Sequence, residues 1–329
     1  VSSLKFEMGK GDDGGVSFAR LAEIVGADPL DLEELKLAGK QLKEIPDLFP
    51  CKRLRRVDMA GNGLESLDCV SGLREVAWLS VKDNQIEDIN PLLKLVKIAV
   101  LNIGSNKITT LDALKRMTSL KALVANNNNI ASLSGLASCH QLNTVVLSNN
   151  PITEISGIQT LKNITKLSFG HCQIRAIPDL TCHPLLEELR LNDNKISKVP
   201  ETLDRNPSLK VLDLGKNRLH DIGDIFRISQ CRHLSNLNFL GNTRLVEQPG
   251  YREKIVGAMP SLVILDGKRL DGERGGKGKY RYKEGYVDPR GFKKGKDGKK
   301  LAEDREGRIE KEGGKRVDVV EKKQGKRGN

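Results

Sequence analysis

The sequence has no long apolar run and no closely spaced pair of cysteines. Its most apolar stretch, residues 91–103, is interrupted by Lys94 and Lys97, which excludes a membrane-spanning helix of about 20 apolar residues. The first 15 residues carry Lys, Glu and Asp where a secretory signal has its apolar core, so we expect no export. Single cysteines favour a reducing compartment over a disulfide framework or a zinc site. They are Cys51, Cys69, Cys139, Cys172, Cys182 and Cys231.

The sequence also lacks the short motifs of common enzymes. It contains no phosphate-binding G-x-x-x-x-G-K-[ST], no dinucleotide-binding glycine motif, no H-E-x-x-H and no G-x-S-x-G. His171 beside Cys172 allows two interpretations, a nucleophile with its base or a structural pair, and we favour the structural one. We therefore predict a protein that is not an enzyme, with no catalytic residue, no metal site and no cofactor.

What the sequence does contain is a repeat. Asn62, Asn84, Asn106, Asn128 and Asn150 are spaced by 22 residues, and Cys172 and Asn194 continue the register. Each position closes the pattern L-x-x-L-x-L-x-x-N/C, which identifies the chain as similar to the leucine-rich-repeat proteins. Ten units begin at Leu32, Leu54, Val76, Ile98, Leu120, Leu142, Ile164, Leu186, Leu209 and Leu234.

The spacing predicts an α/β solenoid, the leucine-rich-repeat horseshoe. Alternating apolar residues give each unit a short strand, and the second half of the unit has the spacing of a 3₁₀ or irregular arc. Stacked units then build a concave parallel β-sheet with a helical or irregular convex side. We expect an N-terminal cap at 1–31, about ten repeats at 32–241, a C-terminal cap at 242–267 and a basic tail at 268–329.

The two caps have their own signatures. A helix over 16–25, with Phe18, Leu21 and Ile24 on one face, is suited to covering the first unit. The segment 242–267 resembles the C-terminal cap shared by the regulatory subunit of protein phosphatase 1, the spliceosomal A-prime protein and axonemal dynein light chain 1. The matching residues are Asn242, Tyr251, Arg252, Val256, Pro260, Leu262 and Asp266.

The tail has a different composition from the repeats. The chain carries a net charge of +12, and residues 268–329 hold 22 Lys and Arg, 12 Asp and Glu and 13 Gly. So few apolar residues predict disorder in the absence of a partner, with a short helix at most over 301–312. Tyrosines interleaved with cations predict RNA binding, and a nuclear-import signal is the alternative. The predicted RNA contacts are Lys277, Lys279, Tyr280, Arg281, Tyr282, Lys283, Tyr286, Arg290, Lys293, Lys294, Lys296, Lys299 and Lys300.

The residues between the leucines of each unit project from the concave sheet. Around the single tryptophan they become small and apolar, which predicts an exposed patch for docking a protein, although simple surface packing of Trp78 is the alternative. The predicted protein-binding residues are Arg56, Trp78, Val100, Ala122, Val124, Val146, Lys166 and Arg190.

Two functional hypotheses follow. The first is a non-catalytic docking scaffold whose concave face binds a protein partner, in the form of a phosphatase regulatory-type subunit that the resemblance implies. The second is a ribonucleoprotein or pre-ribosomal component whose basic tail contacts RNA. Both predict a nuclear or nucleolar protein, with the cytoplasm as the alternative, and neither involves a membrane or a small-molecule substrate.

Overall fold

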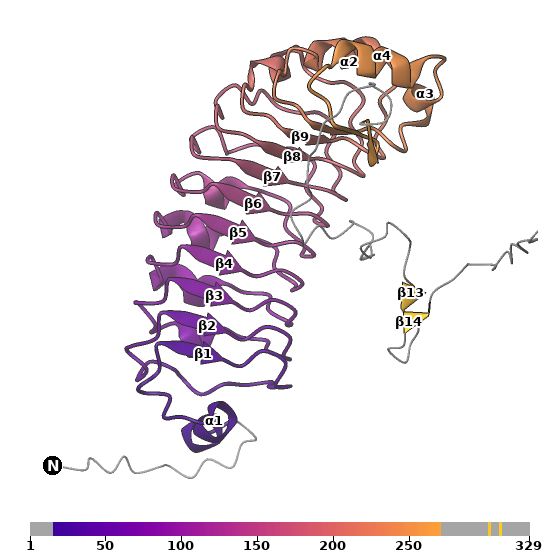
Figure 1. Ribbon diagram of the computed structural model, residues 1–329. Helices are drawn as coiled ribbons and strands as arrows, with labels where there is room; N and C mark the ends of the chain where they lie inside the picture. Colours follow the sequence, from indigo (N-terminus) through magenta and orange to yellow (C-terminus); the bar gives the residue numbers. More distant parts are fainter. Residues whose placement is uncertain (1–15, 271–301, 304–308, 311–329) are drawn as a thin grey trace, which may run out of the picture. The chain divides into compact units, whose positions relative to one another are not determined.

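The computed structural model describes residues 16–270, 302–303 and 309–310, and the chain divides into two units at residues 274 and 275. In the first unit, short strands stack in chain order into one open sheet (Figure 1). Neighbouring strands from β1 to β11 are parallel, while β11 and β12 are antiparallel. The strands are β1 Glu34–Lys36, β2 Arg56–Asp58, β3 Trp78–Ser80, β4 Val100–Asn102, β5 Ala122–Val124, β6 Thr144–Val146, β7 Lys166–Ser168, β8 Glu188–Arg190, β9 Val211–Asp213, β10 Asn236–Asn238, β11 Ile264–Leu265 and β12 Lys268–Arg269. The predicted solenoid is therefore confirmed.

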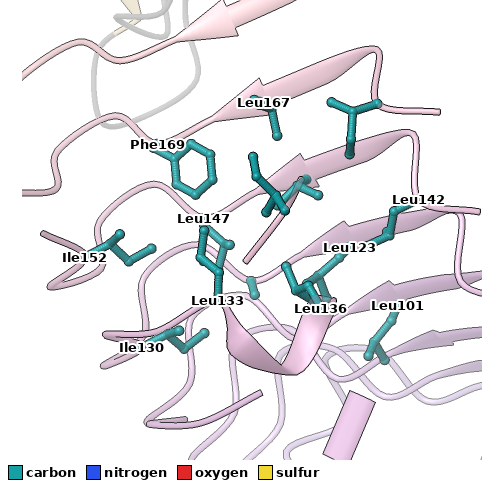
Figure 2. Packing of buried hydrophobic residues seen from close by; sticks show 14 of the residues in the cluster. Leu101, Leu123, Ile130, Leu133, Leu136, Leu142, Leu147, Ile152, Leu167 and Phe169 are labelled. Carbon is teal, nitrogen blue, oxygen red and sulfur yellow. The ribbon is translucent and has the colours of Figure 1, made fainter. Parts of the chain in front are cut away.

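The core lies between the sheet and the convex side. In each strand from β1 to β10 the central residue is buried, because alternate side chains of a strand point to opposite faces. Figure 2 shows Leu101, Leu123 and Leu167 entering the same interior from three units of the stack, with Phe169 on the same strand side as Leu167. Every unit thus buries its leucines against its neighbours, which is why one unit alone would not be stable.

A ladder of asparagine side chains holds the turn after each strand. Asn128 donates from Nδ2 to the carbonyls of Ile103 and Ala125, at 3.0 and 3.2 Å, and its Oδ1 accepts the Ile108 N–H at 3.0 Å. The same bonds link one unit to the next at Asn62, Asn84, Asn106, Asn150, Asn194 and Asn217. The predicted role of this position, satisfying backbone groups where the chain leaves the sheet, is confirmed.

The convex side consists of short arcs, as predicted. Most are single turns of 3₁₀ helix, which suit a segment only a few residues long. They are η1 Asp68–Val70, η2 Asn90–Lys94, η3 Asp112–Arg116, η4 Ser134–Leu136 and η5 Glu201–Arg205, followed by the α-helix α2 Gly223–Ile228.

Caps close both ends of the core. The N-terminal helix α1 (Phe18–Val25) begins at Ser17, whose hydroxyl accepts the Arg20 N–H, and it buries Leu21 completely. The C-terminal cap contains α3 (Thr243–Val246) and α4 (Tyr251–Ala258) before β11. Strand β12 follows and Leu270 is only 1% exposed, so the packed chain continues three residues past the expected boundary at 267.

The second unit contains one described element pair. Strand β13 (Ala302–Glu303) pairs with β14 (Ile309–Glu310) in antiparallel register, so the prediction of a short helix over 301–312 is wrong. Gly307 interrupts this stretch of sequence, and glycine disfavours a helix interior. The tail residues predicted to bind RNA lie outside the described residues. Within the described ranges, no helix has the length and apolar character needed to cross a bilayer.

Candidate functional site: the concave face

The concave face is built from the first and third residues of the strands. The sheet register aligns them in two rows across neighbouring units, as the repeat predicts. The first row reads Glu34, Arg56, Trp78, Val100, Ala122, Thr144, Lys166, Glu188, Val211 and Asn236. The second row reads Lys36, Asp58, Ser80, Asn102, Val124, Val146, Ser168, Arg190, Asp213 and Asn238.

An ion cluster at the N-terminal end of this face holds Trp78 in place. The Arg56 guanidinium lies over the indole ring, 3.5 Å from its centroid, in a cation–π contact. Glu34 accepts Arg56 Nε at 2.8 Å and lies 3.0 Å from Lys36 Nζ. The hydrogen bond from Lys36 and the nearby charge of Arg56 hold the pKa of Glu34 below its usual value. One carboxylate therefore fixes two cations, and one of them orients the ring.

The centre of the face is an apolar floor. Val100 lies opposite Trp78 in the register, Ala122 follows it, and Val124 and Val146 lie side by side in the second row. These side chains and Trp78 are half-buried, less exposed than the sequence suggested. Strands only about 4.8 Å apart bring neighbouring side chains into contact and cover part of each one.

A second ion cluster borders the floor on the C-terminal side. Glu188 lies 3.1 Å from Lys166 Nζ and accepts a hydrogen bond from Arg190 Nε. Burial acts to raise the pKa of Glu188, but Arg190 and Lys166 outweigh it and the pKa is lowered. The carboxylate is thus held ionised between the two cations.

The structure brings all eight predicted protein-binding residues onto one face. Sequence analysis missed the bridging acids Glu34 and Glu188, and it missed the part played by Lys36. A signal was available, because Glu34 and Glu188 are each one repeat away from an opposite charge in the same row. An apolar floor thus lies between two ion clusters. This arrangement is typical of a protein-binding surface, which has a dry centre and a polar rim.

The surroundings of the cysteines and of His171 decide between the two interpretations of the His171 and Cys172 pair. No group of three His, Cys, Asp or Glu side chains among them is placed to hold a metal ion. Burial raises the pKa of the Cys139 and Cys231 thiols to about 11, which keeps them protonated. Cys172 occupies the ladder position, its Sγ 3.6 Å from the Leu147 carbonyl, while His171 pairs with Asp193 at 3.0 Å. The structural interpretation of this pair is therefore the one that fits.

Two protein families, both of leucine-rich repeats, match parts of the chain. The family described as "Leucine-rich repeat" matches residues 168–290, and "Leucine Rich repeats (2 copies)" matches residues 118–160. The segment similar to the C-terminal cap lies inside the first of these ranges.

Curated relatives match about a third of the chain. Acidic leucine-rich nuclear phosphoprotein 32 family member A from Drosophila melanogaster is 31% identical over 107 residues, which are 32% of this chain and 40% of the relative. The probable U2 small nuclear ribonucleoprotein A' from Caenorhabditis elegans is 28% identical over 98 residues, which are 30% of this chain and 38% of the relative. The matches thus span about two fifths of the length of these relatives.

Solved structures share the fold. An internalin from Listeria monocytogenes superposes with a TM-score of 0.65 at 21% identity, covering 76% of this chain and 69% of that one. A leucine-rich-repeat protein from Leptospira interrogans gives a TM-score of 0.56 at 20% identity, covering 71% and 78%. At this level of identity the similarity concerns the fold alone.

Proposed function

Since the chain is a leucine-rich-repeat protein, we propose that it is a non-catalytic docking scaffold that binds a protein partner on its concave face. The observation that carries this proposal is the half-buried apolar floor from Trp78 to Val146 between two clusters in which one glutamate fixes two cations. A partner that covers this floor removes apolar surface from water without breaking an ion pair. The ordered clusters also reduce the side-chain entropy lost on binding.

The names of two relatives support a nuclear location. The two relatives described above carry the words "nuclear phosphoprotein" and "small nuclear ribonucleoprotein" in their names. We propose that this chain, like those two relatives by name, is a nuclear protein. Binding to the catalytic subunit of protein phosphatase 1 tests the phosphatase regulatory role. This subunit is chosen because the C-terminal cap resembles that of its regulatory subunit.

A second candidate function is that of a ribonucleoprotein component. It is favoured by the relative named as a ribonucleoprotein and by the 22 Lys and Arg residues of 268–329, interleaved with Tyr280, Tyr282 and Tyr286. In this proposal the concave face holds a protein and the tail contacts RNA. Cations neutralise phosphates and tyrosines stack on unpaired bases.

Affinity capture with variants of the full chain tests the docking proposal. Ala122→Arg places a long charged side chain on the apolar floor, and Thr109→Arg places the same side chain at an exposed position of the preceding unit outside the concave rows. Partners that bind the floor should be lost with Ala122→Arg and kept with Thr109→Arg. For a purified partner, Trp78→Ala should weaken binding by about 2 kcal/mol. Equal recovery with all three variants would contradict the proposal.

The same capture separates the two candidates. Each preparation is repeated after nuclease treatment and with a chain that ends at Leu270. A protein partner of the concave face should survive both changes. Recovery that depends on the tail and on intact RNA, with Ala122→Arg having no effect, would favour the ribonucleoprotein function over docking on this face.

A further inference from the structure

Charge is distributed unevenly across the width of the first repeats. We call residues 49–55, 71–77, 93–99 and 115–121, which lead from the convex arcs into β2 to β5, the approach edge. It contains nine Lys and Arg residues and one acid, Glu75. The segments that leave the preceding strands, 37–48, 59–70, 81–92 and 103–114, contain eight acids and four cations. The cations of the approach edge are Lys52, Arg53, Arg55, Arg74, Lys94, Lys97, Lys115, Arg116 and Lys121.

Much of this positive charge has no acidic partner. Three of the nine cations form ion pairs with nearby acids. These are Lys97, whose Nζ lies 2.7 Å from Glu75, and Arg53 and Lys115. Of the other cations, several are exposed and form no ion pair within the described part of the chain. These are Lys52, Arg74, Lys94, Arg116 and Lys121. Exposed like charges on neighbouring units repel each other, so the edge gains most from a partner of opposite sign.

The approach edge also contains a hollow of about 420 Å³. Gly72 is one of its lining residues and lets the Phe49 ring pack closely against the backbone, since a Cβ atom there would lie 2.5 Å from Cδ2 of Phe49. The Phe49 side chain is 53% exposed, and the Lys52 ammonium lies 2.9 Å from the centroid of its ring. The remaining lining comes from Cys51, Leu54, Leu73, Arg74 and Glu75.

Further apolar surface lies one unit away from the hollow. Leu93 and Val96 are 40% and 42% exposed, and the 22-residue register places them next to Ser71 and Arg74. Bulky aliphatic side chains in solvent between unpaired cations contribute nothing to solubility. Together with Phe49 they form a patch whose chemistry is apolar at the centre and basic around it.

We propose that the hollow over Gly72 binds an acidic peptide segment of a partner protein, which inserts one large apolar side chain against Phe49 and Leu73. Acidic residues on either side of that anchor pair with Lys52, Arg74 and Lys94. A volume of this size lies in the range of known ligand pockets and accommodates such a side chain. The site is separate from the concave floor and does not depend on the docking function proposed above.

The details favour a peptide over a nucleic acid. The Lys52 ammonium lies over one face of the Phe49 ring, so a base could not stack on that face. The lining is mainly apolar, and Leu93 and Val96 are aliphatic.

A random 12-residue peptide library displayed on phage, selected on the full chain, tests the proposal. One variant, Gly72→Leu, disrupts the hollow, because the new side chain collides with the Phe49 ring, and a second, Arg74→Glu with Lys94→Glu, reverses two exposed charges beside it. The matched control reverses two exposed, unpaired cations outside the approach edge, Lys162→Glu with Arg175→Glu. Thermal melts verify that each variant is folded.

The selected peptides should carry Asp and Glu around one Phe, Leu, Met or Trp. Their affinity should fall by about tenfold or more with each hollow variant and change less than about twofold with the control. Trp78→Ala should leave them unaffected. The proposal is overturned by a failure to enrich peptides, by peptides without acidic residues, or by peptides that bind the hollow variants unchanged. Binding of a single-stranded oligouridine that the same charge reversal abolishes, without an effect on peptides, would assign the edge to nucleic acid instead.

Discussion

The asparagine ladder predicts a large loss of stability from one small substitution. Asn128→Ala removes an acceptor of the Ile108 N–H and a donor to the carbonyls of Ile103 and Ala125. The position is only 7% exposed, so water does not readily replace the lost bonds. The substitution therefore leaves the Ile108 N–H without its acceptor, while the Ile103 and Ala125 carbonyls each lose one of two side-chain donors and keep the bonds from Asn106 and Asn150.

The magnitude follows from these groups. A buried polar group left without a hydrogen bond costs about 1–3 kcal/mol, and each carbonyl that loses one of two bonds adds about 0.5 kcal/mol, so the total should be about 3 kcal/mol. For a domain of this length each kcal/mol lowers the melting temperature by roughly 2 °C, which gives a decrease of roughly 6 °C. This is well above the effect of an ordinary surface substitution, which stays within about 0.5 kcal/mol.

Urea and thermal unfolding followed by circular dichroism measure this loss. Asn129→Ala is the matched control, because Asn129 is the next residue, has the same side chain and is exposed. We expect the control to unfold like the parent chain. If Asn128→Ala and Asn129→Ala unfold alike, the ladder bonds do not carry stability and the reasoning from buried backbone groups is refuted.

Three further predictions use other parts of the fold. Cys172→Asn should raise the free energy of unfolding by about 1 kcal/mol, because asparagine restores the ladder bonds of the neighbouring units; an unchanged or lower value in urea melts would argue against it. A chain ending at Leu270 should melt like the full chain, whereas one ending at residue 267 should melt roughly 4 °C lower, because it loses β12 and a buried leucine; equal melting temperatures would restore the boundary at 267. Burial lowers the pKa of His183 below 6.5, so the unfolded chain binds the proton first and stability falls as the pH drops below that value; His183→Gln should reduce the loss of melting temperature between about pH 7.5 and pH 5.5, and an unchanged loss would assign it to other groups.

The repeat made most of the fold predictable, because it fixes three things at once. Buried leucines set the strand, the asparagine sets the turn, and a constant period sets the register between units. That is why both concave rows could be written down from the sequence. The helix over Phe18–Val25 was predictable for a related reason, since its apolar spacing is local and Ser17 caps it.

Features that depend on a single pair of residues were not predictable in this way. Strand β12 pairs with β11 across a turn at Gly267, a contact that leaves no periodic signal in the sequence. The hollow needs Gly72 and Phe49, which lie in different units and follow no shared pattern. In the ion clusters, the repeat spacing places Glu34 and Glu188 one unit from an opposite charge, but their contacts to Lys36 and Arg190 depend on the direction of long side chains, which spacing does not give.

Two consecutive residues at the start of one strand belong to different surfaces of this protein. Arg56 begins β2 and lies on the concave face over Trp78, whereas Arg55, one residue earlier, belongs to the approach edge. Every unit has such a pair of positions, and neither one is constrained by the leucines or the asparagine that maintain the fold. Partner specificity can therefore change on one surface without altering the core or the other surface. In the proposed functions, this separation allows a protein on the concave floor and an acidic peptide at the hollow to be bound at the same time.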